Sequence, residues 1–225
     1  MGELIQFPAN GHIAHGYLAV PPSGSGLGLL VLQEWWGLVD HIKDVCDRFA
    51  REGFVALAPD LYNGKVTKSP DEAGKLFMAL NIAKAGADLR GAAAALLTRP
   101  ETISTRVGAV GFCMGGQLAL YAAMEYPDQI GAAVDFYGVH PSVRIDPAKV
   151  RVPVLGHFAK RDNSVKEADA RALVAKIQAA GGSVEAHYYE ADHAFFNDTR
   201  PTVHDKACAA AAWQRTLAFL RKQLV

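Results

Sequence analysis

The hydrophobic residues of this chain gather into short runs that alternate with longer segments of helical spacing. Residues 27–33 form a continuous apolar run that ends abruptly at Glu34, which is typical of a strand buried on both faces of a parallel sheet. In residues 40–52 the apolar positions recur three and four apart, as on one face of a helix, and Gly53 ends the pattern. The regular part of the chain therefore begins with a strand and then a helix.

The same alternation continues to the end of the chain. Ahead of it, residues 11–20 are expected to form an extended segment or hairpin arm, ended by Pro21 and Pro22. Repeated strand–helix units predict the α/β class, with an open, mostly parallel central sheet and helices on both faces. Neither a repeat nor a long linker is visible, so residues 1–225 are expected to form one domain. The further predicted strands are 54–58, 107–110, 132–136, 154–158 and 184–189, and the further predicted helices are 71–80, 83–97, 115–126, 166–180 and 202–224.

The composition argues against nucleic acid and membranes as binding partners. The 23 Lys and Arg balance 23 Asp and Glu, so no global basic field attracts nucleic acid or an anionic membrane. The longest apolar runs, such as residues 27–32 and 207–212, are far shorter than the roughly 18 residues that span a bilayer. The N-terminus has no signal-peptide pattern, so we expect a cytoplasmic protein that acts on a small molecule.

A glycine-rich turn, residues 111–116, directly follows a predicted strand and opens a predicted helix. Its sequence is Gly-Phe-Cys-Met-Gly-Gly. A nucleophile at such a corner needs small residues two positions before and after it, and Gly111 and Gly115 meet that need. Because a helix N-terminus stabilises a thiolate and a developing oxyanion, we expect Cys113 as nucleophile and the Met114 N–H as oxyanion donor. The alternative is a small buried cysteine that packs the helix on the sheet.

An acid and a histidine follow Cys113 at the ends of later predicted strands. Asp162 lies just beyond strand 154–158, and His193 lies just beyond strand 184–189. His193 would accept the thiol proton and Asp162 would orient the imidazole. The alternative for Asp162 is a turn or N-cap residue, and the neighbouring Asp192 competes with it for the orienting role. This chain order is that of the α/β-hydrolase triad, so the α/β-hydrolase fold is expected.

Glu34 and Trp35 extend the candidate site. Glu34 ends the first buried strand, where its carboxylate would oppose thiolate formation on Cys113 or accept a hydrogen bond from the thiol. The Trp35 N–H is expected to be the second oxyanion donor, because that donor comes from this loop in such folds. The alternative for Glu34 is a solvated acid at a strand end.

The sequence contains no sign of a cofactor or a metal. The eight histidines are dispersed, no HExxH or Cys/His cluster is present, and the three cysteines are widely spaced. Phosphate-loop and dinucleotide motifs are also absent. We therefore predict no cofactor and no metal. The residues expected to line a substrate pocket are Trp36, Tyr62, Phe77, Tyr137, Phe195 and Asn197.

These residues together resemble the dienelactone hydrolase, or carboxymethylenebutenolidase, family over nearly the whole chain. The resemblance implies that Cys113, Asp162 and His193 form the triad and that Glu34 keeps the resting thiol neutral. It also implies a cofactor-free hydrolase, more often a monomer than an oligomer, that opens a cyclic enol ester to give maleylacetate in the bacterial breakdown of chlorinated aromatics. The motifs that carry it are Gln33–Gly37, Ala58–Tyr62, Gly111–Gly116, Tyr137–Gly138, Asp162 and His193–Phe195.

The chain departs from the family at the arginines that bind the substrate carboxylate. One of these lies four residues after the catalytic histidine, where this chain has Asn197, and the other lies in a helical segment where residues 69–77 contain no arginine. The cations that could replace them are Arg200, Arg161 and Lys68. Two other functions therefore stay open. The first is a broader esterase or thioesterase, and the second is a non-catalytic scaffold that binds a ligand or senses oxidation through Cys113. A further question is whether residues 63–80 act as a lid.

Overall fold

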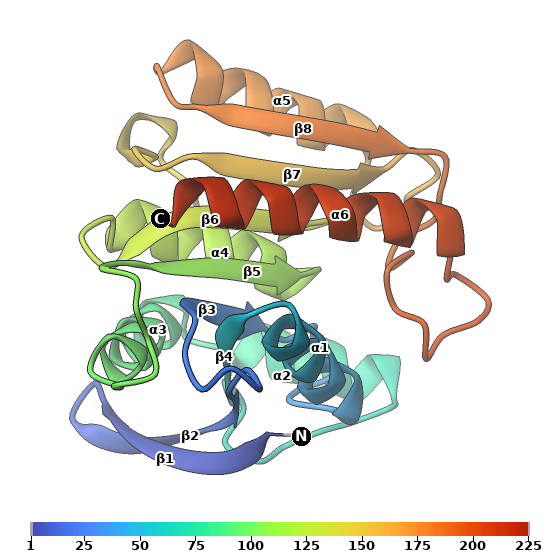
Figure 1. The fold of residues 1–225 in the computed structure, drawn as a ribbon. Helices are drawn as coiled ribbons and strands as arrows, with labels where there is room; N and C mark the ends of the chain where they lie inside the picture. Colours follow the sequence, from blue (N-terminus) through green and yellow to red (C-terminus); the bar gives the residue numbers. More distant parts are fainter. Residues whose placement is uncertain (1, 225) are drawn as a thin grey trace.

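The computed structural model describes residues 2–224, which are built around one eight-stranded sheet (Figure 1). The strand order is β1-β2-β4-β3-β5-β6-β7-β8. The strands from β4 to β8 pair in parallel, and β2 pairs antiparallel with both β1 and β4. The prediction of a mostly parallel sheet is confirmed. The parallel strands are β3 (Leu27–Leu32), β4 (Phe54–Pro59), β5 (Val107–Phe112), β6 (Ile130–Phe136), β7 (Val154–Ala159) and β8 (Val184–Tyr189).

The N-terminal hairpin forms the antiparallel edge of the sheet. The extended segment expected over 11–20 is strand β2 (His12–Ala19), but its partner β1 (Glu3–Ala9) was not predicted. Strand β1 contains Pro8, which cannot donate to a ladder and is tolerated because β1 is the edge strand. A proline in a short run weakened the strand signal, and only pairing with β2 makes this segment a strand.

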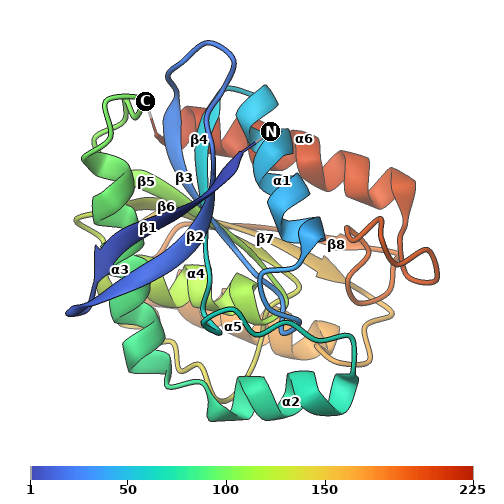
Figure 2. The ribbon, with the colours of Figure 1, turned by 90° about the horizontal axis from the view of Figure 1, so that it is seen from below.

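Helices cover both faces of the sheet, as predicted. Figure 2 shows α1 and α6 on one side and α3, α4 and α5 on the other. Helix α6 begins four residues later than the predicted helix 202–224, because the Asp205 side chain caps it by accepting the Cys208 N–H at 2.9 Å. The helices are α1 (Asp40–Arg51), α2 (Pro70–Ala79), α3 (Ile82–Leu97), α4 (Met114–Glu125), α5 (Glu167–Ala179) and α6 (Lys206–Gln223), with a 3₁₀ turn at Pro147–Lys149.

Two hydrophobic cores lie on the two faces of the sheet. In β3, Leu30 and Leu32 join the core beneath α3 and α4, whereas Leu29 and Val31 join the core beneath α1 and α6. All four side chains are fully buried, as the period of two along a strand requires. The apolar run of β3 is continuous because both of its faces are covered. Within residues 2–224, no helix has the length and apolarity needed to cross a membrane.

The parallel strands bring their following loops to one edge of the sheet. The loops after β3, β5, β7 and β8 carry Glu34, Cys113, Asp162 and His193. Residues that are up to 159 positions apart in the chain therefore meet, since parallel strands share the direction of their carboxyl ends. Residues 190–205 form the longest of these loops and lead from β8 to α6 (Figure 1).

Helix α1 holds this long loop through buried and charged groups. His41 is almost fully buried, and its Nδ1 lies 3.5 Å from the Oδ1 of Asp198. Asp198 also accepts a hydrogen bond from Arg48 at 2.5 Å. Burial lowers the pKa of His41 to about 4, although Asp198 opposes part of this shift. The His41 imidazole is therefore harder to protonate in the folded protein than in the unfolded chain.

We expect the protein to lose stability as the pH falls from about 6.5 towards about 4, because the unfolded chain then binds a proton at His41 that the folded protein does not. The contribution of this histidine is at most about 1.4 kcal/mol per pH unit. Urea unfolding at several pH values, with His41→Gln and the exposed His15→Gln as matched variants, measures it. His41→Gln should flatten the pH dependence and His15→Gln should not. An unchanged slope in His41→Gln would contradict the assignment.

Candidate active site

Cys113 occupies the sharp turn between β5 and α4. Its backbone has φ 54° and ψ −118°, a left-handed conformation that a residue with a side chain adopts only when its surroundings impose it. Met114 is the first residue of α4, so its N–H belongs to the helix N-terminus, where the first four N–H groups have no partner within the helix. The turn thus directs the thiol out of the sheet beside free backbone donors.

The two glycines of the turn allow three backbone segments to touch. A Cβ on Gly111 would lie 1.9 Å from the carbonyl oxygen of Gly115, and a Cβ on Gly115 would lie 2.5 Å from the carbonyl oxygen of Gln33. Neither distance is compatible with a side chain. The turn therefore packs directly against the end of β3, the strand that leads into Glu34.

Asp162 and His193 form a close pair at the same edge of the sheet. The Nδ1 of His193 lies 2.7 Å from the Oδ2 of Asp162, whose side chain is fully buried. The other carboxylate oxygen, Oδ1, accepts the N–H groups of Ser164 and Val165, each at 2.7 Å. Asp162 therefore has both of the roles considered from the sequence, since it fixes the turn after β7 and also binds the imidazole.

His193 is a strong base in this setting. Burial lowers the pKa of its imidazole, but the interactions with Asp162 and Cys113 raise it more, to about 10. Asp192 points elsewhere and pairs with Arg161 at 3.3 Å. Of the two neighbouring aspartates, Asp162 is thus the one that binds the ring.

Glu34 is buried at the end of β3 and is 1% exposed. Its Oε2 accepts a hydrogen bond from the Asn197 side chain at 3.0 Å, and among residues 2–224 its Oε1 has no hydrogen-bond partner. Burial raises the pKa of Glu34, and the nearby His193, Asn197 and Arg200 offset part of that shift. The sequence indicated partial desolvation of Glu34, but nothing in it indicated the contact with Asn197.

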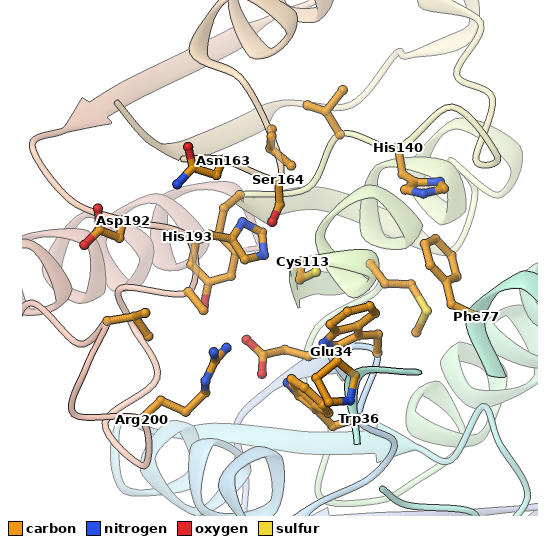
Figure 3. Close-up of a pocket in the computed structure, with 18 of the residues that line it drawn as sticks. Glu34, Trp36, Phe77, Cys113, His140, Asn163, Ser164, Asp192, His193 and Arg200 are labelled. Carbon is orange, nitrogen blue, oxygen red and sulfur yellow. The ribbon is translucent and has the colours of Figure 1, made fainter. Parts of the chain in front are cut away.

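A cavity of about 670 Å³ opens over these groups (Figure 3). Figure 3 shows Cys113 between His193 and Glu34, with the Arg200 side chain reaching in from the loop that carries His193. The wall combines aromatic and charged groups, a composition that suits a small polar molecule with an apolar body. Residues considered from the sequence that line it are Glu34, Trp35, Trp36, Phe77, Cys113, Met114, Tyr137, His193, Arg161 and Arg200.

Three residues expected in the pocket wall lie behind it instead. Tyr62 is buried and donates its hydroxyl to the sulfur of Met114 at 3.2 Å. Phe195 is fully buried in the core beneath α1 and α6. Asn197 is 2% exposed and binds Glu34. His140 also lies in the cavity wall, although its neighbours in the sequence gave no sign of this. The centroid of its ring lies 4.4 Å from that of the Phe77 ring.

Backbone strain concentrates around the cavity. Among residues 2–224, five non-glycine residues have positive φ, and Cys113, Tyr137 and Ala194 are three of them. All three line the cavity. Strained conformations persist only where the surrounding structure determines them, and they collect at functional sites.

The basic side chains around the cavity differ in whether they form an ion pair. Arg161 is engaged by Asp192, whereas Arg200 forms no ion pair within the part of the chain that is described, and lies over the Trp36 ring at 5.7 Å. Lys68 is exposed and is not part of the cavity wall. Arg200 is thus the cation best placed to receive an anionic group of a ligand. No group of three or more potential metal ligands occurs among residues 2–224.

Comparisons with known proteins give consistent matches. The sequence model of the dienelactone hydrolase family matches residues 14–224. The chain is 38% identical to Protein usf of Aquifex pyrophilus and 34% identical to a candidate carboxymethylenebutenolidase of Aquifex aeolicus, with 100% of each chain covered. In three dimensions it is similar to the crystal structure of a candidate dienelactone hydrolase from Klebsiella pneumoniae, with a TM-score of 0.87, 30% identity and 98% of each chain covered.

We expect Asp162→Asn to lower the pKa of the His193 ring by more than one unit, because the Asp162 carboxylate makes the hydrogen bond that favours the charged ring. NMR titration of the ring measures this. The native ring should titrate at a higher pH than the variant ring, by more than one unit. Asp192→Asn is the matched control and should leave the titration unchanged. A native ring that titrates near pH 6.5 would contradict the geometry.

Proposed function

Since the chain belongs to the dienelactone hydrolase family, we propose that it hydrolyses a cyclic enol ester of the dienelactone type through a thioester on Cys113. The observation that carries this proposal is the convergence of three groups in one cavity: the strained Cys113, the His193–Asp162 pair at 2.7 Å and the buried Glu34. Such a set supplies a nucleophile, a base and an orienting acid.

In the first half of the reaction, His193 takes the proton of the Cys113 thiol. The ring takes this proton in its neutral form, and the contacts with Asp162 and the Cys113 sulfur, which raise the pKa of His193, stabilise the imidazolium that forms. The sulfur then attacks the ester carbonyl carbon, and the N–H groups of Met114 and Trp35 stabilise the oxyanion. As the carbonyl re-forms, the bond between the acyl carbon and the ring oxygen breaks. The leaving enolate takes the proton from the His193 imidazolium, which leaves an open-chain thioester on Cys113.

In the second half, His193 removes a proton from a water molecule as the oxygen attacks the thioester carbonyl. The carbon–sulfur bond breaks, the product leaves as a carboxylic acid, and Cys113 regains its proton from His193. An enolate is a better leaving group than an amine, so the reaction needs little help from a general acid. A cysteine is therefore a sufficient nucleophile for this class of ester.

Glu34 restrains the thiol in the resting enzyme. It lines the same cavity as Cys113, and its carboxylate opposes the formation of a second negative charge there. Burial raises the pKa of Glu34. Binding of substrate displaces this restraint and frees the thiol to react.

Arg200 binds the carboxylate of the substrate. It lines the cavity without an ion pair among residues 2–224, and a guanidinium binds a carboxylate through two parallel hydrogen bonds. The uncharged Asn197 and the absence of arginine in residues 69–77 favour a second candidate, a broader esterase for activated neutral esters. In that case the substrate would lack the carboxylate, and Arg200 would not discriminate between substrates.

Cys113→Ala should lower the rate of ester hydrolysis at least about a thousandfold while the protein stays folded, because the sulfur that forms the acyl intermediate is removed. Initial rates with cis- and trans-dienelactone and with p-nitrophenyl acetate, together with circular dichroism, measure this. Cys208→Ala, a cysteine in α6, is the control and should keep full activity. Unchanged hydrolysis in Cys113→Ala would refute the mechanism, whereas no hydrolysis by the native protein would favour a ligand-binding or redox-sensing scaffold.

Arg200→Gln should lower kcat/KM for the dienelactones about tenfold to a hundredfold and change that for p-nitrophenyl acetate less than about twofold, because only the lactones present a carboxylate. The matched control is Arg161→Gln, whose arginine is already paired with Asp192 and should matter less. Equal losses on both kinds of substrate would favour the broader esterase.

A further inference from the structure

Asn197 is the buried polar residue that contacts Glu34 directly. It lies in the loop between β8 and α6, four residues after His193, and is 2% exposed. Its side-chain N–H donates to the Oε2 of Glu34 at 3.0 Å. This is the only hydrogen bond that the Glu34 carboxyl makes within residues 2–224, since its Oε1 has none.

The orientation of the Asn197 amide is fixed by its other contacts. Its Oδ1 accepts the backbone N–H of Thr199 at 3.1 Å and the hydroxyl of Thr199 at 2.6 Å. A backbone N–H can only donate, so the oxygen of the amide must face Thr199 and the nitrogen must face Glu34. The side chain cannot flip without losing these bonds.

The backbone of Asn197 is tied to the residues that flank the site. Its N–H donates to the carbonyl of Ala194, next to His193, and its carbonyl accepts the N–H of Arg200. These two bonds are 2.9 and 3.1 Å long. Asn197 thus links Glu34 to the segment that carries His193 and Arg200.

We propose that Asn197 is the positioning residue that holds the Glu34 carboxyl in its resting place in the cavity of Cys113. This inference rests on the proposed cysteine mechanism and adds a residue to it. Because the amide carries no charge, it fixes the position of the carboxyl without neutralising it. The titratable and charged groups that face Glu34 are His193 and Arg200 from the same loop and Tyr137 after β6.

Loss of the amide has a predictable electrostatic consequence. The hydrogen bond from Asn197 favours the ionised form of Glu34, so removing it raises the pKa of Glu34 further. Glu34 is then neutral over a wider pH range, and its repulsion of a thiolate on Cys113 is weaker. The thiol should therefore react at lower pH in a variant that lacks this hydrogen bond.

The test is the rate at which iodoacetamide alkylates Cys113 as a function of pH, in a Cys208→Ala background and without substrate. Asn197→Leu should move the midpoint of this profile to lower pH by about one unit, which corresponds to about tenfold faster alkylation below the midpoint. Asn81→Leu, in which an exposed asparagine outside this cavity receives the same change, should leave the midpoint in place. If Asn197→Leu does not fold, Asn197→Ala, which adds no bulk, gives the same comparison.

A double variant distinguishes positioning from a merely structural role. In a Glu34→Gln background, Asn197→Leu should cause no further shift, because the group that it positions has lost its charge. A shift of equal size in that background, or no shift in Asn197→Leu alone, would overturn the proposal. Neither result would refute the cysteine mechanism, which fails only if Cys113→Ala retains ester hydrolysis.

Discussion

The close approach of the turn after β5 to the end of β3 is the constraint on which the site depends. At Gly111 and Gly115 the backbone segments are so near that no side chain fits between them. This contact forces Cys113 into its strained conformation and sets the start of α4 beside it. It also fixes where the chain leaves β3, and hence where Glu34 enters the cavity. Cys113, the N–H of Met114 and Glu34 thus take their places from one packing contact.

The second organising feature is the number of hydrogen bonds that each buried carboxyl group makes. Asp162 is buried with three hydrogen bonds, whereas Glu34 is buried with one. The hydrogen bonds of Asp162 fix both of its oxygens, whereas burial with a single hydrogen bond raises the pKa of Glu34. Two acids of similar intrinsic strength thus differ within one site: Asp162 binds the His193 ring, and Glu34 lies in the cavity with a raised pKa.

The loop between β8 and α6 brings these parts together. It carries His193, Asn197 and Arg200, and Asp198 within it is held by Arg48 of α1. A long loop that is tied at several points can hold side chains as firmly as a helix does, and its backbone strain at Ala194 is maintained by those ties. Asn197 gives this loop an uncharged side-chain contact with Glu34.

The sequence by itself determined the order of strands and helices, the parallel sheet and the edge at which the site lies, because those follow from the period of apolar residues and from chain direction. It also indicated Cys113, Asp162 and His193, whose residue types and spacing are local signals. Only tertiary packing decided that β1 is a strand and that α6 starts late. It also decided that Tyr62 and Phe195 lie outside the cavity wall. The contact between Asn197 and Glu34 joins residues 163 positions apart, and no local pattern encodes such a pair. Local periodicity fixes which face of a helix or strand is apolar, but only the packed fold decides which polar atoms form hydrogen bonds with one another.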